Sequence, residues 1–489
     1  MINFLILSLA LTTSEEKSIY KSLDTRNIDA NIAYSQLFPN SPEGRKALER
    51  AWQLLGSHAS LGLMPPLSKD IFDKLTNFKP AAIFDEKTLC LIERLAQNLP
   101  NRKLKGHSVK TWQEILDLPL EEIEISRGLL IEDTITRRSY EASLDLLALK
   151  ALAKLPQGLK SLPEKKIEAI NQLIFFDMAM RYPPLSLSEK HIDSYSSLGA
   201  VLDSSRGICL GTSFVYLAIA ERIGLTLEII TPPGHIYVRA YDHKGGRINI
   251  ETTARGVDIS DRHYQSINVK QLQLRTRREA IGLIFFNEAS VNLRTHNFEK
   301  ALACYEKAEI FIKNDSTLMQ LKAMCLILTG QKKRAIEYLE SNIHLKDPHQ
   351  IDQLTLAEDY LKGAVSEDTL RVFFTESKVS RKDLGVKCNL LKEALKNNPE
   401  FREGLLELTD IYLKLNRPKE ALEVLQRYHA IHPNRLQVEF MLGSLSLDRI
   451  LYQEAYQHLC NVRELLNSHG QKSREFEEAW RSLSVHYTP

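Results

Sequence analysis

The sequence predicts a mostly α-helical, multidomain protein with one small α+β core and a C-terminal α-solenoid. Apolar residues recur at helical spacing through most of the chain, and two short runs of alternating character near its middle are typical of strands. Alanines recur at a fixed long interval in the C-terminal part, which indicates stacked helical repeats. At 489 residues the chain is too long for a single hydrophobic core, so we expect two or three domains.

The first segment, residues 1–14, is an apolar N-terminus. No Lys or Arg precedes Lys17, so the positive region of a secretory signal is missing, and about ten apolar residues are too few to cross a bilayer. We therefore expect a cytoplasmic protein without a transmembrane segment, in which these residues form a buried first helix. Export through a short N-terminal signal is the alternative.

Two helical segments precede the centre of the chain. Residues 15–110 are expected to form a helical N-terminal region, with apolar stripes around 47–55 and 89–99. Residues 111–280 are expected to form the core domain and open with strongly helical sequence. The loop at 105–107, near the end of the first segment, has no assigned role.

A single cysteine in the core segment lies between a glycine turn and an apolar helix. Residues 206–213 read Arg-Gly-Ile-Cys-Leu-Gly-Thr-Ser, after a turn expected at 203–207. The next residues are expected to form a helix over 210–223 that Gly224 ends. Cys209 should therefore lie at the helix N-terminus, where free backbone N–H groups and the helix dipole favour the thiolate.

A histidine and a carboxylate follow on two predicted strands of one hairpin. His235 is expected to open the first strand, the turn 242–246 reverses the chain, and Glu251 ends the second strand. Strand alternation places His235 on the same face as Tyr237 and Arg239, and Glu251 on the polar face of its own strand. The hairpin should thus present His235 and Glu251 side by side.

Cysteine, histidine and carboxylate together are typical of nucleophilic catalysis. An unassisted thiol is only a few per cent ionised near neutral pH, so an imidazole must take its proton, and a carboxylate must fix the imidazole's tautomer. Backbone N–H groups at the helix start would hold the oxyanion. Each residue also has an ordinary alternative, in which Cys209 is a small buried residue, His235 is structural, and Glu251 pairs with Arg255 or Arg239.

The motifs over residues 195–256 also carry a family resemblance. The stretches 206–211, 233–235 and 249–253, which read Arg-Gly-Ile-Cys-Leu-Gly, Pro-Gly-His and Asn-Ile-Glu-Thr-Thr, resemble the transglutaminase-like cysteine superfamily. Within that superfamily they are most similar to a bacterial, regulator-type branch whose members often carry tetratricopeptide tails.

The resemblance implies a papain-like α+β core. We expect no metal and no other cofactor. It implies that Cys209 is the nucleophile, His235 the base and Glu251 the orienting carboxylate. The superfamily usually has Asp at the last position, so the longer Glu251 arm implies either a displaced strand or another orienting group. Members of the branch frequently lack the cysteine, whereas this chain keeps it.

The C-terminal segment, residues 283–489, repeats with the 34-residue period of tetratricopeptide helix pairs. We expect four or five units, of which one near 357–386 is degenerate, with small residues where two helices approach closely. Such solenoids mostly bind peptides or proteins in a concave groove. The alanines that share the interval form three series: Ala289, Ala323 and Ala357; Ala301 and Ala335; and Ala421 and Ala455.

Composition argues against several classes of function. A formal net charge of +2 offers no field for nucleic acid, so no nucleic-acid partner is expected. The 6 cysteines are scattered without a Cys-x-x-Cys pair, which argues against a zinc site or a disulfide framework. His344, His429 and His432 lack the spacing of metal ligands, and no phosphate-binding or dinucleotide motif occurs.

Two functions stay open from the sequence alone. The first is a transglutaminase-like cysteine hydrolase or acyl-transferase acting on a protein or peptide amide, with the repeats recruiting a protein partner. The second is a catalytically inactive scaffold or regulator of the same fold that works by protein–protein binding. The presence of Cys209 together with His235 favours the enzyme.

Overall fold

The structure, a computed structural model, describes residues 13–57, 83–100, 133–184, 194–376 and 380–487. It divides into two compact units, the first formed by 1–184, 194–229 and 236–259, the second by 185–193, 230–235 and 260–489. The predicted mostly α-helical, multidomain fold is confirmed. The apolar residues 1–12 and the loop at 105–107 lie outside the described residues.

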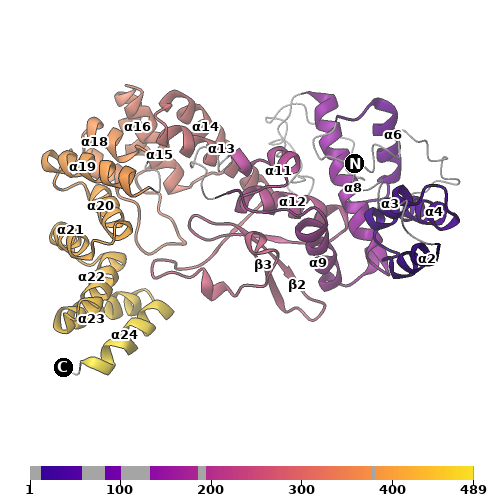
Figure 1. The fold of residues 1–489 in the computed structure, drawn as a ribbon. Coiled ribbons are helices and arrows are strands. Elements are labelled where there is room, and N and C mark those ends of the chain that lie inside the picture. The colour runs from indigo at the N-terminus through magenta and orange to yellow at the C-terminus, as the bar shows by residue number, and fades with distance from the viewer. Residues whose placement is uncertain (1–12, 58–82, 101–132, 185–193, 377–379, 488–489) are drawn as a thin grey trace. The chain divides into compact units, whose positions relative to one another are not determined.

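The first unit is built mainly from helices (Figure 1). α8 is buried around most of its circumference, and Asp133 caps its first turn by accepting a hydrogen bond from the Thr136 N–H. α9 continues into a π-helical turn, Gln172–Asp177. The helices are α2 (Thr13–Ser22), α3 (Ile28–Leu37), α4 (Pro42–Gly56), α6 (Glu86–Leu95), α8 (Thr134–Ala153), α9 (Pro163–Asn171), α11 (Leu198–Ser204) and α12 (Cys209–Arg222).

The chain also forms one small sheet, in which the strand order is β3-β2-β1-β4. The boundary between the two units falls within β1. β2 and β3 form the predicted antiparallel hairpin, with Val238 opposite Ile250 and Arg239 opposite Asn249. α12 packs on β2 and also contacts α8, α9 and α11 (Figure 1). The strands are β1 (Glu228–Thr231), β2 (Tyr237–Tyr241), β3 (Arg247–Ile250) and β4 (Gln273–Arg275).

The hairpin differs from its prediction at the ends of its strands and in its burial. β2 begins at Tyr237, so His235 precedes the strand instead of opening it, and β3 ends at Ile250, so Glu251 follows its strand instead of ending it. The strand face predicted as polar is also buried, because its polar groups bond one another: Arg239 donates from Nε to Asn249 Oδ1 over 2.8 Å and from Nη2 to the Tyr237 hydroxyl over 3.0 Å. Hydrogen bonds of this kind offset the cost of removing polar groups from water.

The second unit consists of successive antiparallel helices (Figure 1). Every alanine at the 34-residue interval is at most 1% exposed, as expected for small residues at close crossings. The short α17 and α18 occupy the part predicted to be degenerate, and no strand occurs among the described residues from 283 onward. The helices are α13 (Arg277–Arg294), α14 (Phe298–Phe311), α15 (Ser316–Leu328), α16 (Lys332–Asn342), α17 (Leu356–Leu361), α18 (Glu367–Phe373), α19 (Arg381–Asn397), α20 (Arg402–Lys414), α21 (Pro418–Ile431), α22 (Leu436–Asp448), α23 (Tyr452–Ser468) and α24 (Arg474–His486).

A left-handed residue recurs at the turn inside the repeats. His296, Gly330, Asn416 and Ile450 each lie two residues past the end of a helix and have φ values between 59° and 81°. This conformation ends a helix by turning the chain back over its last carbonyls, and Gly and Asn adopt it most readily. Ile450 destabilises its turn more than the other three residues do, because a β-branched side chain is strained in the left-handed conformation.

We predict that Ile450→Asn stabilises the repeat region by about 1 kcal/mol, because it removes left-handed strain from a β-branched residue. The Ile450 side chain is 69% exposed and loses little packing. Urea unfolding should show a higher midpoint for Ile450→Asn. The reciprocal Asn416→Ile should lower the midpoint, and equal midpoints for wild type and both variants would contradict the argument.

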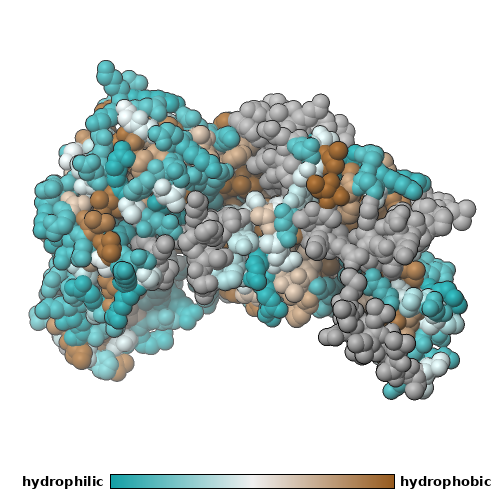
Figure 2. Space-filling model, turned by 45° about the horizontal axis from the view of Figure 1, so that its top comes forward, coloured by the Kyte–Doolittle hydropathy of each residue, from teal (hydrophilic) through white to brown (hydrophobic). Residues whose placement is uncertain are grey.

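Among the described residues on the face shown in Figure 2, hydrophilic side chains prevail and hydrophobic ones are scattered. The exposed large hydrophobic residues of the described chain are likewise spread over many elements, as is normal for a folded protein. None of the described helices combines the length and apolar character required to span a membrane.

Candidate functional site

Cys209 is the first residue of α12, as predicted. The residue before it, Ile208, is the N-cap and offers no side-chain hydrogen bond, so the first-turn N–H groups are not capped by a side chain. The turn that precedes the helix is shorter than predicted, because α11 extends to Ser204 and only Ser205 is left-handed. Cys209 is a free, partly exposed thiol at a helix end that favours negative charge.

Glycines flank the cysteine because the backbone is tightly packed there. A Cβ at Gly211 would lie 2.4 Å from the Tyr195 carbonyl oxygen and 2.5 Å from Val201 Cγ2. A Cβ at Gly207 would lie 2.4 Å from Thr212 Oγ1. Close packing thus accounts for both glycines of the Arg-Gly-Ile-Cys-Leu-Gly sequence.

We predict that Gly211→Ala destabilises the first unit by about 1–3 kcal/mol, the usual range for overpacking, since a backbone carbonyl cannot move aside as a side-chain tip can. Gly199→Ala is the matched control on the neighbouring α11, because its Cβ would meet only Tyr140 Cζ at 3.7 Å. Urea unfolding should separate the two variants. Equal stability would contradict the packing argument.

Glu251 follows β3 directly and is only 4% exposed. Its Oε1 accepts two hydrogen bonds from Thr253, from the backbone N–H over 2.9 Å and from the hydroxyl over 2.5 Å. Its backbone N–H donates to the Val257 carbonyl over 3.0 Å. Arg255 makes no side-chain ion pair with any described residue, so the alternative that Glu251 pairs with Arg255 is wrong.

The segment carrying Glu251 is tied to the cysteine helix within the first unit. Ser213 Oγ on α12 lies 3.0 Å from Thr252 Oγ1, and both side chains are buried. Gly256 approaches Asn171 so closely that a Cβ there would lie 2.2 Å from Asn171 Oδ1. Tyr216 on α12 donates to that same oxygen over 3.0 Å. Asn171 therefore contacts both the cysteine helix and the turn after Glu251.

His235 belongs to the second unit, where a tight turn and an aromatic ring position it. The His235 N–H donates to the Pro232 carbonyl over 3.1 Å, and Gly234 has a φ of +70°. Pro233 at the second and Gly234 at the third position make this a type II turn. The imidazole stacks on Tyr264 with ring centroids 5.6 Å apart and an interplanar angle of 15°.

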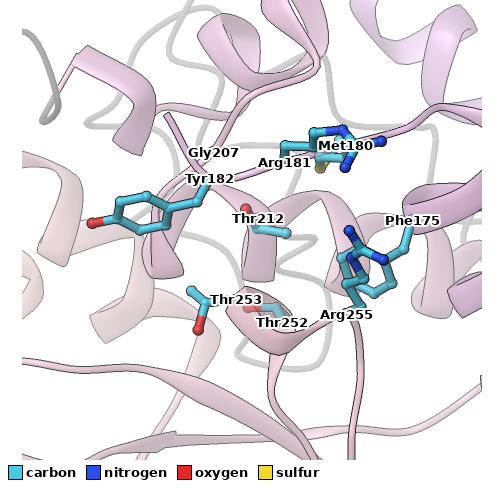
Figure 3. Close-up of a pocket in the computed structure, with 9 residues that line it drawn as sticks. All are labelled: Phe175, Met180, Arg181, Tyr182, Gly207, Thr212, Thr252, Thr253 and Arg255. Atoms are coloured by element: carbon cyan, nitrogen blue, oxygen red, sulfur yellow. The ribbon is translucent and has the colours of Figure 1, made fainter. Parts of the chain in front are cut away.

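A cavity of about 210 Å³ opens beside the Cys209 and Glu251 segments in the first unit (Figure 3). Gly207 and Thr212 line it from the cysteine motif, and Thr252 and Thr253 from the turn after Glu251. The other lining residues are Phe175, Met180, Arg181, Tyr182 and Arg255.

The cavity is suited to an anionic group. No lining residue is acidic, and neither Arg181 nor Arg255 has a side-chain ion pair with a described residue. Figure 3 shows these two arginines on the same side of the cavity and the Tyr182 ring on the other. No pattern in the sequence indicates this cavity, because its lining comes from separate segments that only the fold brings together.

The second unit contains a larger, acidic groove of about 470 Å³ along the repeats. Asp347, Asp352, Glu403, Glu407 and Asp410 line it, with Arg435 as the basic residue among them. Glu403 is held in place because its Oε1 accepts from the Thr355 N–H over 3.0 Å and the Thr355 hydroxyl over 2.8 Å. The groove is therefore a polar surface in which Glu403 is held by hydrogen bonds.

Comparisons with known proteins agree with this arrangement. Residues 138–290 match the family described as the transglutaminase-like superfamily, and residues 389–439 match the tetratricopeptide repeat. No curated protein matches the chain.

Solved structures similar to the chain include the MamA RS-1 ArsTM double mutant, with 16% identity, coverage of 39% of this chain and 97% of that chain, and a TM-score of 0.20. They also include MamA 41-end from Desulfovibrio magneticus RS-1, with 18% identity, coverage of 38% and 96%, and a TM-score of 0.19. The two family matches support a transglutaminase-fold protein that binds other proteins. The chain thus joins a transglutaminase-like domain to tetratricopeptide repeats.

Proposed function

We propose that the protein is a cysteine hydrolase or acyl-transferase that acts on an amide of a protein or peptide and recruits a partner protein through its repeats. The observation that supports this most is the place of Cys209, a partly exposed thiol on the first residue of a helix without a side-chain cap, inside the domain that matches the transglutaminase-like family. Such a position favours the thiolate that attacks carbon.

The proposed reaction has two steps. His235 takes the proton of Cys209, the sulfur attacks the amide carbonyl, and the first-turn N–H groups of α12 stabilise the oxyanion. The tetrahedral intermediate collapses as His235 gives its proton to the leaving amine, which leaves a thioester on Cys209. Water or an amine, deprotonated by His235, then attacks that thioester and restores the thiol.

Glu251 orients the imidazole in this proposal. Its burial and the two Thr253 hydrogen bonds to Oε1 hold the carboxylate rigid, as an orienting group requires. The neighbouring cavity would take the part of the substrate next to the reacting amide, and its two arginines favour an acidic side chain there.

The second candidate function is a scaffold that binds partners without turnover. The acidic groove of the repeats favours partner binding under either function, because it offers charged and hydrogen-bonding groups to a peptide segment. Turnover at Cys209 separates the two candidates.

We also propose that the protein works in the cytoplasm. All 6 cysteines are free, and Cys304, Cys325 and Cys388 are buried as thiols. Unpaired thiols are typical of a reducing compartment.

Competition for iodoacetamide tests whether Cys209 is activated. If exposure alone governed alkylation, the exposed Cys90 would react before the partly exposed Cys209. An activated thiol reverses this order, so we expect Cys209 to be alkylated about tenfold faster than Cys90 at neutral pH, because an unassisted thiol is only a few per cent ionised. Peptide mass spectrometry after short exposures measures both rates in one sample.

The buried cysteines provide an internal standard for the same experiment. Burial raises the pKa of Cys304 to about 11 and that of Cys325 to about 12, so both should stay unmodified in the folded protein. Unfolding in urea should equalise the six rates. If Cys209 reacts no faster than Cys90 in the folded protein, the enzyme is rejected in favour of the scaffold.

A further inference from the structure

Two histidines and a glutamate converge in the last repeats, far along the chain from Cys209. His429 on α21, Glu439 on α22 and His458 on α23 place their ligand-bearing atoms within 4.8 Å of one another. Glu439 is completely buried, whereas the side chains of His429 and His458 are 35% and 19% exposed. The spacing of His429 along the sequence did not indicate a ligand, and only the fold brings it beside Glu439 and His458.

Hydrogen bonds satisfy one side of the Glu439 carboxylate and leave the other open. Oε2 lies 2.9 Å from His458 Nδ1 and accepts from Asn461 Nδ2 over 3.1 Å. Oε1 lies 2.6 Å from His429 Nδ1, yet neither of these two buried atoms is in a hydrogen bond with a described residue. Their approach is therefore not along a hydrogen-bonding direction.

The geometry of the cluster suits a cation. The fully buried Glu439 carboxylate lies between two imidazole nitrogens, at 2.6 Å from His429 Nδ1 and 2.9 Å from His458 Nδ1. Its Oε1 makes no hydrogen bond with a described residue. A carboxylate buried in this way is stabilised by positive charge, which a metal ion supplies without protonating either ring.

We propose that His429, Glu439 and His458 form a divalent-cation site of the zinc type. Two imidazole nitrogens and one carboxylate oxygen are a usual ligand set for zinc, with a fourth position left to water or a partner's side chain. Zinc bonds of about 2.0–2.2 Å place neighbouring ligand atoms about 3.3 Å apart in a tetrahedron. The separations of 2.6 and 2.9 Å reach that value if the side chains part by less than about 1 Å.

Asn461 completes the site from outside the ligand set. Its bond to Oε2 fixes the carboxylate so that Oε1 faces His429, in the way that neighbouring groups commonly orient a metal-binding carboxylate. A metal here would lock α21, α22 and α23 together, the three helices that supply the ligands. The site is independent of the proposed chemistry at Cys209.

Equilibrium dialysis of the full chain against zinc tests the site. We expect the wild type to retain one more zinc ion per chain than His429→Gln, His458→Gln or Glu439→Gln, and each variant to bind at least about tenfold more weakly. His469→Gln is the matched control, because His469 is an exposed histidine just past α23 and is not in the cluster. It should bind zinc as the wild type does.

Thermal unfolding gives a second readout that background binding does not imitate. Zinc should raise the unfolding midpoint of the wild type and of His469→Gln but not that of the three cluster variants. If Glu439→Gln fails to fold, the two histidine variants still show whether the cluster binds zinc. Equal zinc content and equal zinc-induced shifts in the wild type and both histidine variants would overturn the proposal.

Discussion

Glu251→Gln is expected to lower the alkylation rate of Cys209 at least about tenfold at neutral pH while leaving the fold intact. The carbonyl oxygen of Gln can still accept both Thr253 hydrogen bonds that Oε1 accepts now, so the local turn should persist. What is lost is the negative charge that holds the imidazole in the tautomer able to take a proton, a change that costs about 10⁴-fold in turnover of a serine triad. For alkylation the loss is smaller, because it is limited by the thiolate fraction.

Arg255→Ala is the control for this prediction. Arg255 neighbours the same turn and lines the cavity, but makes no side-chain ion pair with a described residue. The rate at Cys209 should therefore stay within about twofold of wild type, because the carboxylate proposed to orient the imidazole is left in place. Mass spectrometry measures the alkylation rate of Cys209 in both variants and the wild type, and circular dichroism checks that each variant is folded. An unchanged rate in Glu251→Gln would remove Glu251 from the site.

Asp145→Ala is expected to destabilise the first unit by about 3–5 kcal/mol, since it leaves a buried guanidinium without its counter-charge. Asp145 on α8 accepts from Arg222 Nε on α12 over 3.0 Å, and both side chains are at most 1% exposed. Arg222 also donates to the Ala218 carbonyl over 3.0 Å. The ion pair holds the C-terminal end of α12, the helix that begins with Cys209. Loss of the pair should therefore also destabilise the position of Cys209.

A double variant separates a buried charge from a packing defect. Asp145→Leu combined with Arg222→Met removes both charges while keeping apolar volume, and it should recover most of the lost stability. Urea unfolding of both variants provides the comparison. A loss below about 1 kcal/mol in Asp145→Ala would mean that water reaches the pair and that it does not hold α12.

Local signals in the sequence were sufficient for the repeats and for the cysteine helix. The alanine interval predicted helix pairs because only small residues fit where two helices cross, and Ala301, Ala335, Ala421 and Ala455 are all fully buried. The apolar run after Cys209 and the glycine at 224 predicted α12 to within a residue at each end, since Gly224 adopts the left-handed conformation with a φ of +66°.

Features that depend on distant segments escaped prediction. The alternation of apolar and polar residues predicted the two strands of the hairpin. It did not predict that Arg239 is buried against Asn249 and Tyr237, because burial of both faces depends on what covers the sheet. The cavity takes its lining from separate stretches of chain. His429, Glu439 and His458 are 10 and 19 residues apart on three helices, so no short motif marks them.

The alkylation rate of Cys209 in His235→Gln tests most directly the central claim, that this thiol is activated by that histidine. His263→Gln is the matched control, because His263 is exposed and contacts the ring of Tyr264, on which His235 also stacks. We expect the rate at neutral pH to fall at least about tenfold in His235→Gln and to stay at the wild-type value in His263→Gln. Equal rates in the wild type and in both variants would contradict the claim and leave Cys209 as an ordinary thiol.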